Sequence, residues 1–363
     1  MATDALAADC AGWVARLRGS PCALRLATTA GALLAQALDC LRVEPWHLPK
    51  PRCVRTVTSE RVDGLRMCKA GAAKLFFKTF DAGWTKPPVV VVHGGPGGSH
   101  HHLLRLVHLA KQGRSVVFYD QLGCGGSDDP DDPEGELYGI TQSAGELASV
   151  IEHVCTKHGV EKVHVIGQSW GGVLAYECIL RGAANSRVAS LTLSNAPSSV
   201  KKMWEACDRY REVVERRYGV SCAPWDTTPE QSDVFGAAHY CRVFPKPRHL
   251  AHGGLPKKKN NFVGSDKVAD FAVRDRGVAE RAFPSSLRTL LVSGEFDIVA
   301  PEVVEPWLDA LPEGRATWHL IQGASHGPYE ESKRCRDEFF RVVRDFLEAA
   351  EAELPASRRP SAR

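Results

Sequence analysis

The chain carries a Gly-x-Ser-x-Gly motif within the segment Val165-Ile166-Gly167-Gln168-Ser169-Trp170-Gly171-Gly172-Val173. The β-branched run at residues 162–166 predicts a buried strand before the motif, and residues 172–180 predict a helix after it. Glycine allows the chain to turn sharply from strand to helix, and this turn lifts the serine hydroxyl above the sheet. The amide-rich start of the helix then faces an oxyanion that forms there. The segment therefore predicts Ser169 as the nucleophile of a serine hydrolase, and a chance match to a short pattern is the alternative.

A serine nucleophile needs a base to remove its proton and an acid to orient that base. In hydrolases built on a parallel sheet, these residues follow the serine in the order acid, histidine. Residues 287–297 predict a strand and a turn that ends on Asp297, and residues 317–328 predict a strand and a loop that carries His326. Both side chains follow the C-terminal end of a strand, where open α/β sheets bind ligands. Asp297 is the predicted acid and His326 the predicted base, with Glu295 as the alternative acid.

A glycine-rich loop at residues 94–98 follows a predicted strand at residues 88–93, which contains four consecutive valines. Such a loop brings backbone N–H groups close to a substrate carbonyl. The predicted oxyanion hole consists of the amides of Gly95 and Trp170, the residue after the nucleophile. Phosphate binding is the alternative, but the loop has neither a Gly-Lys-Ser/Thr ending nor dinucleotide-binding spacing.

Strand-like and helix-like stretches alternate along the chain, which predicts an α/β fold with a mostly parallel, doubly wound sheet. An antiparallel hairpin, with its turn at Asp63-Gly64, is predicted before the parallel strands. A helical insertion at residues 196–283 interrupts the alternation and predicts a lid over the site. The predicted parallel strands cover residues 88–93, 115–120, 162–166, 188–194, 287–292 and 316–321.

The composition fits a soluble globular protein and argues against a nucleic-acid partner. The 363 residues are 44% hydrophobic and 25% charged, with a net charge of +3. This charge is too small to indicate nucleic-acid binding, and no segment is long and apolar enough to span a bilayer. We expect a cytoplasmic protein. Residues 1–50 form an extension that is either an organelle-targeting segment or an added helix.

The cysteine pattern argues against a metal site. Twelve cysteines occur without a Cys-x-x-Cys pair or zinc-type spacing, and this pattern suits a reducing compartment. The run His100-His101-His102 is the alternative metal-ligand cluster, although adjacent side chains at the start of a helix diverge. We therefore expect no metal and no cofactor, and the sequence does not indicate an oligomeric state.

Several segments resemble, in the same order, those of the proline iminopeptidases (prolyl aminopeptidases) and their tricorn-associated relatives. The more specific pair is His93-Gly94-Gly95-Pro96-Gly97 with an Asp-Gln-x-Gly-x-Gly-x-Ser turn at residues 120–127. The resemblance implies an α/β-hydrolase fold and release of N-terminal residues, proline above all, from short peptides. It also implies that residues 120–127 form a structural turn beside the site. The other matching segments are residues 167–172, 294–297 and 325–326.

Two positions depart from that family's pattern. The resemblance implies acidic side chains that hold the free ammonium of the substrate, one directly after the aspartate of the triad and one in the lid. This chain has Ile298 at the first position and Asn261 at the second. An unpaired ammonium is costly to desolvate, so these changes weaken the expected amine specificity unless lid acids such as Glu205 or Glu230 replace them. A small amide or ester is therefore the alternative substrate.

The sequence pattern predicts four parts of the chain. They are the N-terminal extension (1–50), an α/β-hydrolase core (51–195 and 284–352), the helical lid (196–283) and a basic tail (353–363).

Two other classes of function are weighed against a serine hydrolase. A dehalogenase or an epoxide hydrolase needs a carboxylate where this chain has Ser169. A non-catalytic binding protein with this fold is the remaining alternative, since a fold does not determine a function. The presence of all three triad candidates argues against it.

Overall fold

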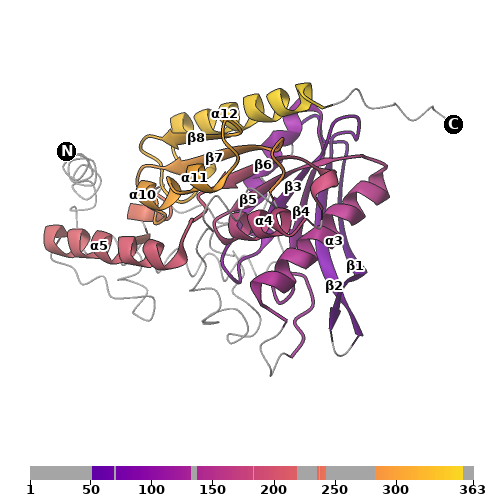
Figure 1. The fold of residues 1–363 in the computed structure, drawn as a ribbon, viewed down its shortest axis with the longest axis horizontal. Helices are drawn as coiled ribbons and strands as arrows, with labels where there is room; N and C mark the ends of the chain where they lie inside the picture. Colours follow the sequence, from indigo (N-terminus) through magenta and orange to yellow (C-terminus); the bar gives the residue numbers. More distant parts are fainter. Residues whose placement is uncertain are drawn as a thin grey trace, which may run out of the picture.

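Eight strands form one sheet in the computed structural model, which describes residues 51–68, 71–131, 137–182, 184–218, 235–236, 238–242 and 283–354 (Figure 1). β2 pairs antiparallel with both β1 and β4, and all other neighbours are parallel. The predicted α/β fold, a mostly parallel sheet preceded by an antiparallel hairpin, is confirmed. In spatial order the strands are β1 (Thr56–Cys68), β2 (Gly71–Asp81), β4 (Val116–Asp120), β3 (Val89–Val92), β5 (Val163–Gln168), β6 (Val188–Ser194), β7 (Arg288–Gly294) and β8 (Ala316–Ile321).

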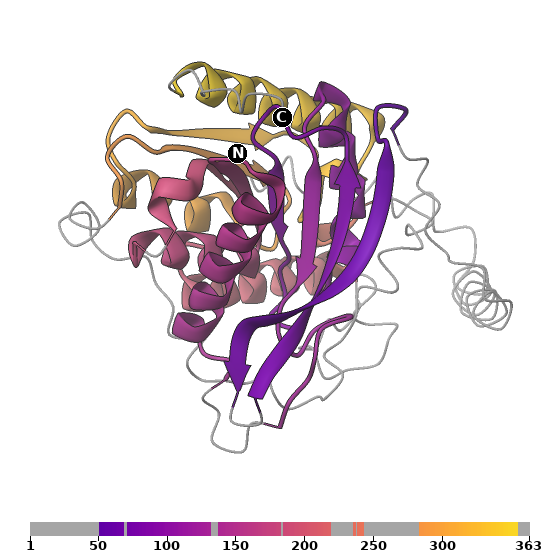
Figure 2. The ribbon, with the colours of Figure 1, turned by 90° about the vertical axis from the view of Figure 1, so that its right-hand side faces the viewer.

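Helices cover both faces of the sheet, so the sheet is doubly wound (Figure 2). One face packs against α3 (Ile140–His158), α4 (Trp170–Leu180), α10 (Pro301–Val304) and α11 (Trp307–Ala310). The opposite face packs against η1 (His100–Gln112) and α12 (Lys333–Ala352). The remaining elements are η2 (Asn185–Arg187), η3 (Pro328–Glu330) and α5 (Val200–Tyr218), which begins the insertion after β6.

The central strand β3 shows why this sequence forms a buried parallel sheet. Its four valines are all buried. Because side chains alternate along a strand, Val90 and Val92 pack into the core on the α3 and α4 face. Val89 and Val91 pack into the core on the η1 and α12 face. A continuous β-branched run is therefore expected here, since both faces of the strand are covered.

The predicted hairpin turn at Asp63-Gly64 is wrong. β1 runs through this dipeptide and remains paired with β2 beyond it. The register shifts between Val62 and Arg66, and Gly64 adopts a φ of +80°. Glycine tolerates this left-handed conformation, so the dipeptide forms a β-bulge within the strand and does not reverse the chain.

Parts of the predicted organisation lie outside the described residues. These are the N-terminal extension, residues 355–363 of the tail, and residues 219–234, 237 and 243–282 of the insertion. Helix α5 belongs to the predicted lid and lies within the described residues. The domain boundaries therefore remain predictions.

The described ranges contain neither a candidate membrane span nor a candidate metal cluster. No helix in them combines the length and the apolar character needed to cross a bilayer. No group of three His, Cys, Asp or Glu side chains in them could hold a metal ion.

A buried ionic cluster fixes α12 to the start of the parallel strands. The Arg114 guanidinium, which is fully buried, donates from Nη2 and Nε to Glu351 Oε1 at 2.6 and 3.0 Å. His164 Nε2 lies 3.3 Å from the same oxygen. Burial alone would raise the pKa of Glu351, but hydrogen bonds from His164 and Arg114 outweigh it and lower this pKa to about 2. The carboxylate thus stays charged in the folded protein over the whole neutral and mildly acidic range.

We expect Glu351→Gln to lower the free energy of unfolding by about 3 kcal/mol at neutral pH, because it leaves the buried Arg114 charge unpaired. The folded-state pKa of Glu351 lies below its ordinary value of 4.5. The carboxylate therefore contributes fully above that value, and its contribution is lost as the pH falls towards 2. Urea denaturation of wild type and variant should show a difference that shrinks as the pH falls from about 5 to about 2.

Glu353→Gln is the matched control. Glu353 pairs with Arg288 and Arg315 at 2.9 and 3.0 Å, and its side chain is 49% exposed. Exposed ion pairs contribute about 0–1 kcal/mol. A loss as large in Glu353→Gln as in Glu351→Gln would contradict the role assigned to the buried cluster.

Candidate active site

The order of the strands places the candidate residues at one edge of the sheet. β3 lies between β4 and β5, so successive connections leave the centre of the sheet in opposite directions. Ligands bind beyond the C-terminal ends of the strands at such a switch point. The loop at residues 94–98 follows β3, and Ser169 follows β5 directly. Asp297 and His326 follow β7 and β8 at the same edge.

Ser169 occupies a strained turn between β5 and α4. Its φ and ψ are 54° and −125°, a conformation that non-glycine residues rarely adopt. A Cβ atom at Gly167 would lie 2.3 Å from the carbonyl oxygen of Gly171, and one at Gly171 would lie 2.2 Å from that of Val92. Both glycines are therefore required by close backbone approach. The Ser169 amide donates to Ser194 O at 2.8 Å, which ties the turn to β6.

Asp297 and His326 are brought together by the loops after β7 and β8. His326 Nδ1 lies 2.6 Å from Asp297 Oδ1, and the carboxylate is fully buried. Since a carboxylate only accepts, the proton lies on Nδ1, and Nε2 is left to accept a proton from another group. Glu295, the alternative acid, instead accepts from the Gly323 amide at 2.9 Å. The geometry therefore pairs Asp297 with the histidine.

Asn195 is a residue that sequence reasoning missed. Its Nδ2 donates to Asp297 Oδ2 at 2.5 Å and approaches Ser325 O at 3.3 Å. Its φ is +54°, and its own amide donates to Val292 O at 2.7 Å. The only signal in the sequence is its place directly after the last residue of β6. The Asn195 amide donates to the aspartate oxygen that His326 does not use, and this second bond fixes the plane of the carboxylate.

A short piece of the insertion supports His326. The His326 amide donates to His239 O at 3.1 Å, and the Tyr240 ring packs edge-on against the His326 ring at 5.3 Å. His239 is itself held, because its Nδ1 donates to Phe296 O at 2.8 Å. Burial lowers the pKa of His239 to about 4, so this ring is neutral. The insertion therefore contacts the candidate base directly.

The glycine-rich loop lies against Ser169. A Cβ atom at Gly94 would lie 2.9 Å from Ser169 Cβ, so only glycine fits there. Gly95 is exposed and has a φ of +128°. Trp170 is the first residue of α4, at the amide-rich end of the helix. The roles of the Gly95 and Trp170 amides as an oxyanion hole remain predictions.

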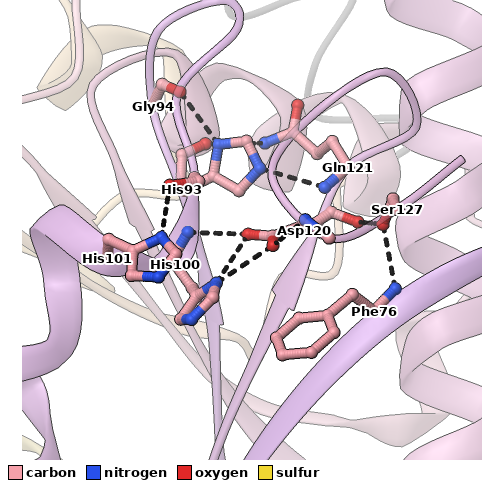
Figure 3. A network of polar contacts seen from close by, with 10 residues as sticks. Phe76, His93, Gly94, His100, His101, Asp120, Gln121 and Ser127 are labelled. Atoms are coloured by element: carbon pink, nitrogen blue, oxygen red, sulfur yellow. Dashed lines mark hydrogen bonds and ion pairs between the residues drawn. The ribbon is translucent and has the colours of Figure 1, made fainter. Parts of the chain in front are cut away.

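The three consecutive histidines bind different partners. His100 Nδ1 lies 2.9 Å from Asp120 Oδ1, whereas His101 Nδ1 lies 3.1 Å from Ser99 Oγ (Figure 3). His102 packs against the loop at residues 94–98, and its pKa falls to about 3, mainly through burial. The polar partners differ, but the ring centroids of His100 and His101 lie only 4.0 Å apart, so these two side chains do not diverge as predicted.

Of the two positions that depart from the family pattern, Ile298 lies within the described residues and Asn261 lies outside them. Ile298 follows Asp297, is buried, and its carbonyl accepts from Cys207 Sγ of α5 at 3.6 Å. Asn261 lies outside the described residues, as does Glu230. Glu205 lies on α5 and is exposed.

Comparisons with known proteins agree with this fold. A family model for the alpha/beta hydrolase fold matches residues 87–214. A proline iminopeptidase of Lactobacillus delbrueckii subsp. lactis is 31% identical over 236 residues, which cover 60% of this chain and 76% of that protein. One of Thermoplasma volcanium is 29% identical over 301 residues, which cover 78% of this chain and 98% of that protein. The crystal structure of the Mycobacterium smegmatis proline iminopeptidase is 26% identical with a TM-score of 0.62, covering 81% of this chain and 99% of that one. The chain is therefore a hydrolase and belongs to the proline iminopeptidase family.

Proposed function

We propose that this protein is a serine aminopeptidase that releases N-terminal residues from short peptides through an acyl-enzyme. Ser169 is the nucleophile, His326 the general base and Asp297 the acid that orients it. The observation that carries the proposal is the 2.6 Å bond from His326 to the buried Asp297, at the edge of the sheet where Ser169 is held in a strained turn. This combination is the arrangement that activates a serine hydroxyl.

The reaction follows from these roles. Ser169 Oγ attacks the carbonyl carbon while His326 Nε2 takes the hydroxyl proton. The Gly95 and Trp170 amides donate hydrogen bonds to the negative oxygen of the tetrahedral intermediate. The C–N bond then breaks, and His326 returns the proton to the departing amine. A water molecule repeats the sequence on the acyl-enzyme and restores Ser169.

The relatives favour an N-terminal proline in the substrate, since the similar proteins carry the name proline iminopeptidase. One observation favours a small amide or ester instead. The buried carboxylates described around His326 are already bonded: Glu330 to Arg105 at 2.7 Å and Glu331 to the Arg242 amide at 3.1 Å. Ile298 adds an apolar side chain, not a charge. A substrate ammonium would therefore rely on acids outside this set, such as those of the lid.

Ser169→Ala should abolish hydrolysis, with a fall in kcat of roughly 10⁴-fold or more, because no other group can form the acyl-enzyme. A fluorophosphonate probe should label the wild type and not this variant. Ser149→Ala is the control, since Ser149 lies on α3 and its hydroxyl donates to Gly145 O of the same helix. Labelling that survives in Ser169→Ala would exclude Ser169 as the nucleophile.

Proline β-naphthylamide should be cleaved at least roughly tenfold faster than its N-acetyl form, because an aminopeptidase site stabilises a free ammonium that the acetyl group removes. The comparison uses kcat/KM for both compounds and for a short-chain p-nitrophenyl ester. Equal cleavage of the free and acetylated compounds would reject the aminopeptidase and support the amide or ester hydrolase.

Asn195→Ala should lower kcat by roughly 10- to 100-fold with little change in KM, because a freed Asp297 carboxylate no longer holds His326 in one orientation. Ser194→Ala is the matched control. Ser194 Oγ donates to Asn195 Oδ1 at 3.0 Å. Removing this hydroxyl leaves the bond from Asn195 Nδ2 to Asp297 in place. Equal losses of kcat in the two variants would contradict a specific role for the Asn195 amide.

A further inference from the structure

The segment from His93 to His100 is bonded at both ends to the turn that follows β4 (Figure 3). At one end, Gln121 Nε2 donates to His93 O at 2.7 Å. At the other end, the His100 amide donates to Asp120 Oδ1 at 2.7 Å, and His100 Nδ1 lies 2.9 Å from the same oxygen. This segment contains Gly95, the predicted oxyanion donor. Its two ends are therefore held while the loop between them borders Ser169.

The contacts of His93 select one tautomer of its ring. The Gln121 backbone amide donates to His93 Nε2 at 3.0 Å, so Nε2 carries no proton. Burial lowers the pKa of His93, and the neutral ring then has its proton on Nδ1. That nitrogen lies 2.9 Å from Gly94 O and donates to it. The approach of Gln121 Nε2 to Nδ1 at 3.2 Å is a contact between two donors, and the Gln121 amide proton is directed to His93 O instead.

The Gly94 carbonyl determines where the Gly95 amide points. A trans peptide is planar, and its C=O and N–H groups point in opposite directions. Gly94 O accepts from His93 Nδ1 and also from the Gly98 amide at 3.2 Å. These two donors fix the plane of the Gly94–Gly95 peptide. The Gly95 N–H is thereby directed away from His93.

We propose that His93 is a positioning residue for the oxyanion hole, which in its Nδ1–H tautomer orients the Gly94–Gly95 peptide so that the Gly95 amide faces the substrate oxygen. Gln121 sets the tautomer through its backbone amide. Asp120 holds the far end of the segment at His100. The assignment rests on the proposed function, because the oxyanion exists only if Ser169 attacks a carbonyl.

The test compares two substitutions, each of which keeps one of the two hydrogen bonds of the His93 ring: the bond to Gly94 O or the bond from the Gln121 amide. His93→Asn places an amide donor near the position of Nδ1 and can still donate to Gly94 O. His93→Gln reaches the position of Nε2, where it can accept from the Gln121 amide but cannot donate to Gly94 O. We expect His93→Gln to lower kcat roughly 100-fold with KM within about threefold of wild type, the usual effect of losing one oxyanion donor. His93→Asn should keep at least about a tenth of the wild-type kcat.

Ser127→Ala is the matched structural control. Ser127 Oγ belongs to the same turn, donates to Asp120 O at 2.5 Å and accepts from the Phe76 amide at 2.9 Å, away from the glycine-rich loop (Figure 3). This variant should lower Tm without changing kcat or KM. Equal losses of kcat in His93→Asn and His93→Gln, or a change in KM alone, would overturn the positioning role.

The tautomer itself is measured on the wild-type protein, which keeps the proposal testable if the variants do not fold. Histidine-selective ¹⁵N NMR distinguishes an Nδ1–H ring from an Nε2–H ring, and the His93→Asn spectrum or a direct assignment identifies the signals. An Nε2–H ring at His93 would overturn this inference and leave the proposed function intact. A wild type that neither hydrolyses the probe substrates nor labels with fluorophosphonate would instead reject the proposed function, and the role of His93 with it.

Discussion

The close approach of three backbone segments around Ser169 is the constraint on which the site depends. β3, the end of β5 and the start of α4 meet at distances that exclude a Cβ atom at Gly167, at Gly171 and at Gly94. A larger residue at any of these positions would push the strands apart or flatten the turn. The position of Ser169 therefore depends on the absence of side chains at these three glycines. The loop that supplies the predicted oxyanion donor is placed by the same contact.

The sequence predicted the parts of this molecule that are determined locally. The valine run of β3, the glycines of the turn and the strand–loop order of Asp297 and His326 are all visible without coordinates. The exceptions depend on contacts between distant segments. Asn195 has no motif, and its importance comes from the arrival of Asp297, 102 residues later. Gly64 looked like a hairpin turn because a dipeptide cannot reveal that both strands continue beyond it.

The two ends of the sheet are built from different chemistry. At the ends where the parallel strands begin, Arg114 and Glu351 form a charged cluster whose role is to hold α12 in place. At the opposite ends, the rings of His93 and His239 are kept neutral by burial and act through single hydrogen bonds to carbonyls. The first end is held by an ion pair, whereas the second combines the buried carboxylates of Asp120 and Asp297 with neutral histidine rings. Ile298, which departs from the family pattern, is buried at this second end, directly after Asp297.

The Arg114–Glu351 pair also has a consequence for the order in which the molecule is made. The two residues are separated by 237 positions. At ordinary rates of translation, the ribosome reaches the glutamate roughly 10–50 s after the arginine. During that interval the sheet can begin to assemble, but Arg114, at the end where the parallel strands begin, does not yet have Glu351 as its partner. The nascent chain therefore lacks the partner of Arg114 until α12 emerges, so burial of this guanidinium as an ion pair waits for the synthesis of that helix.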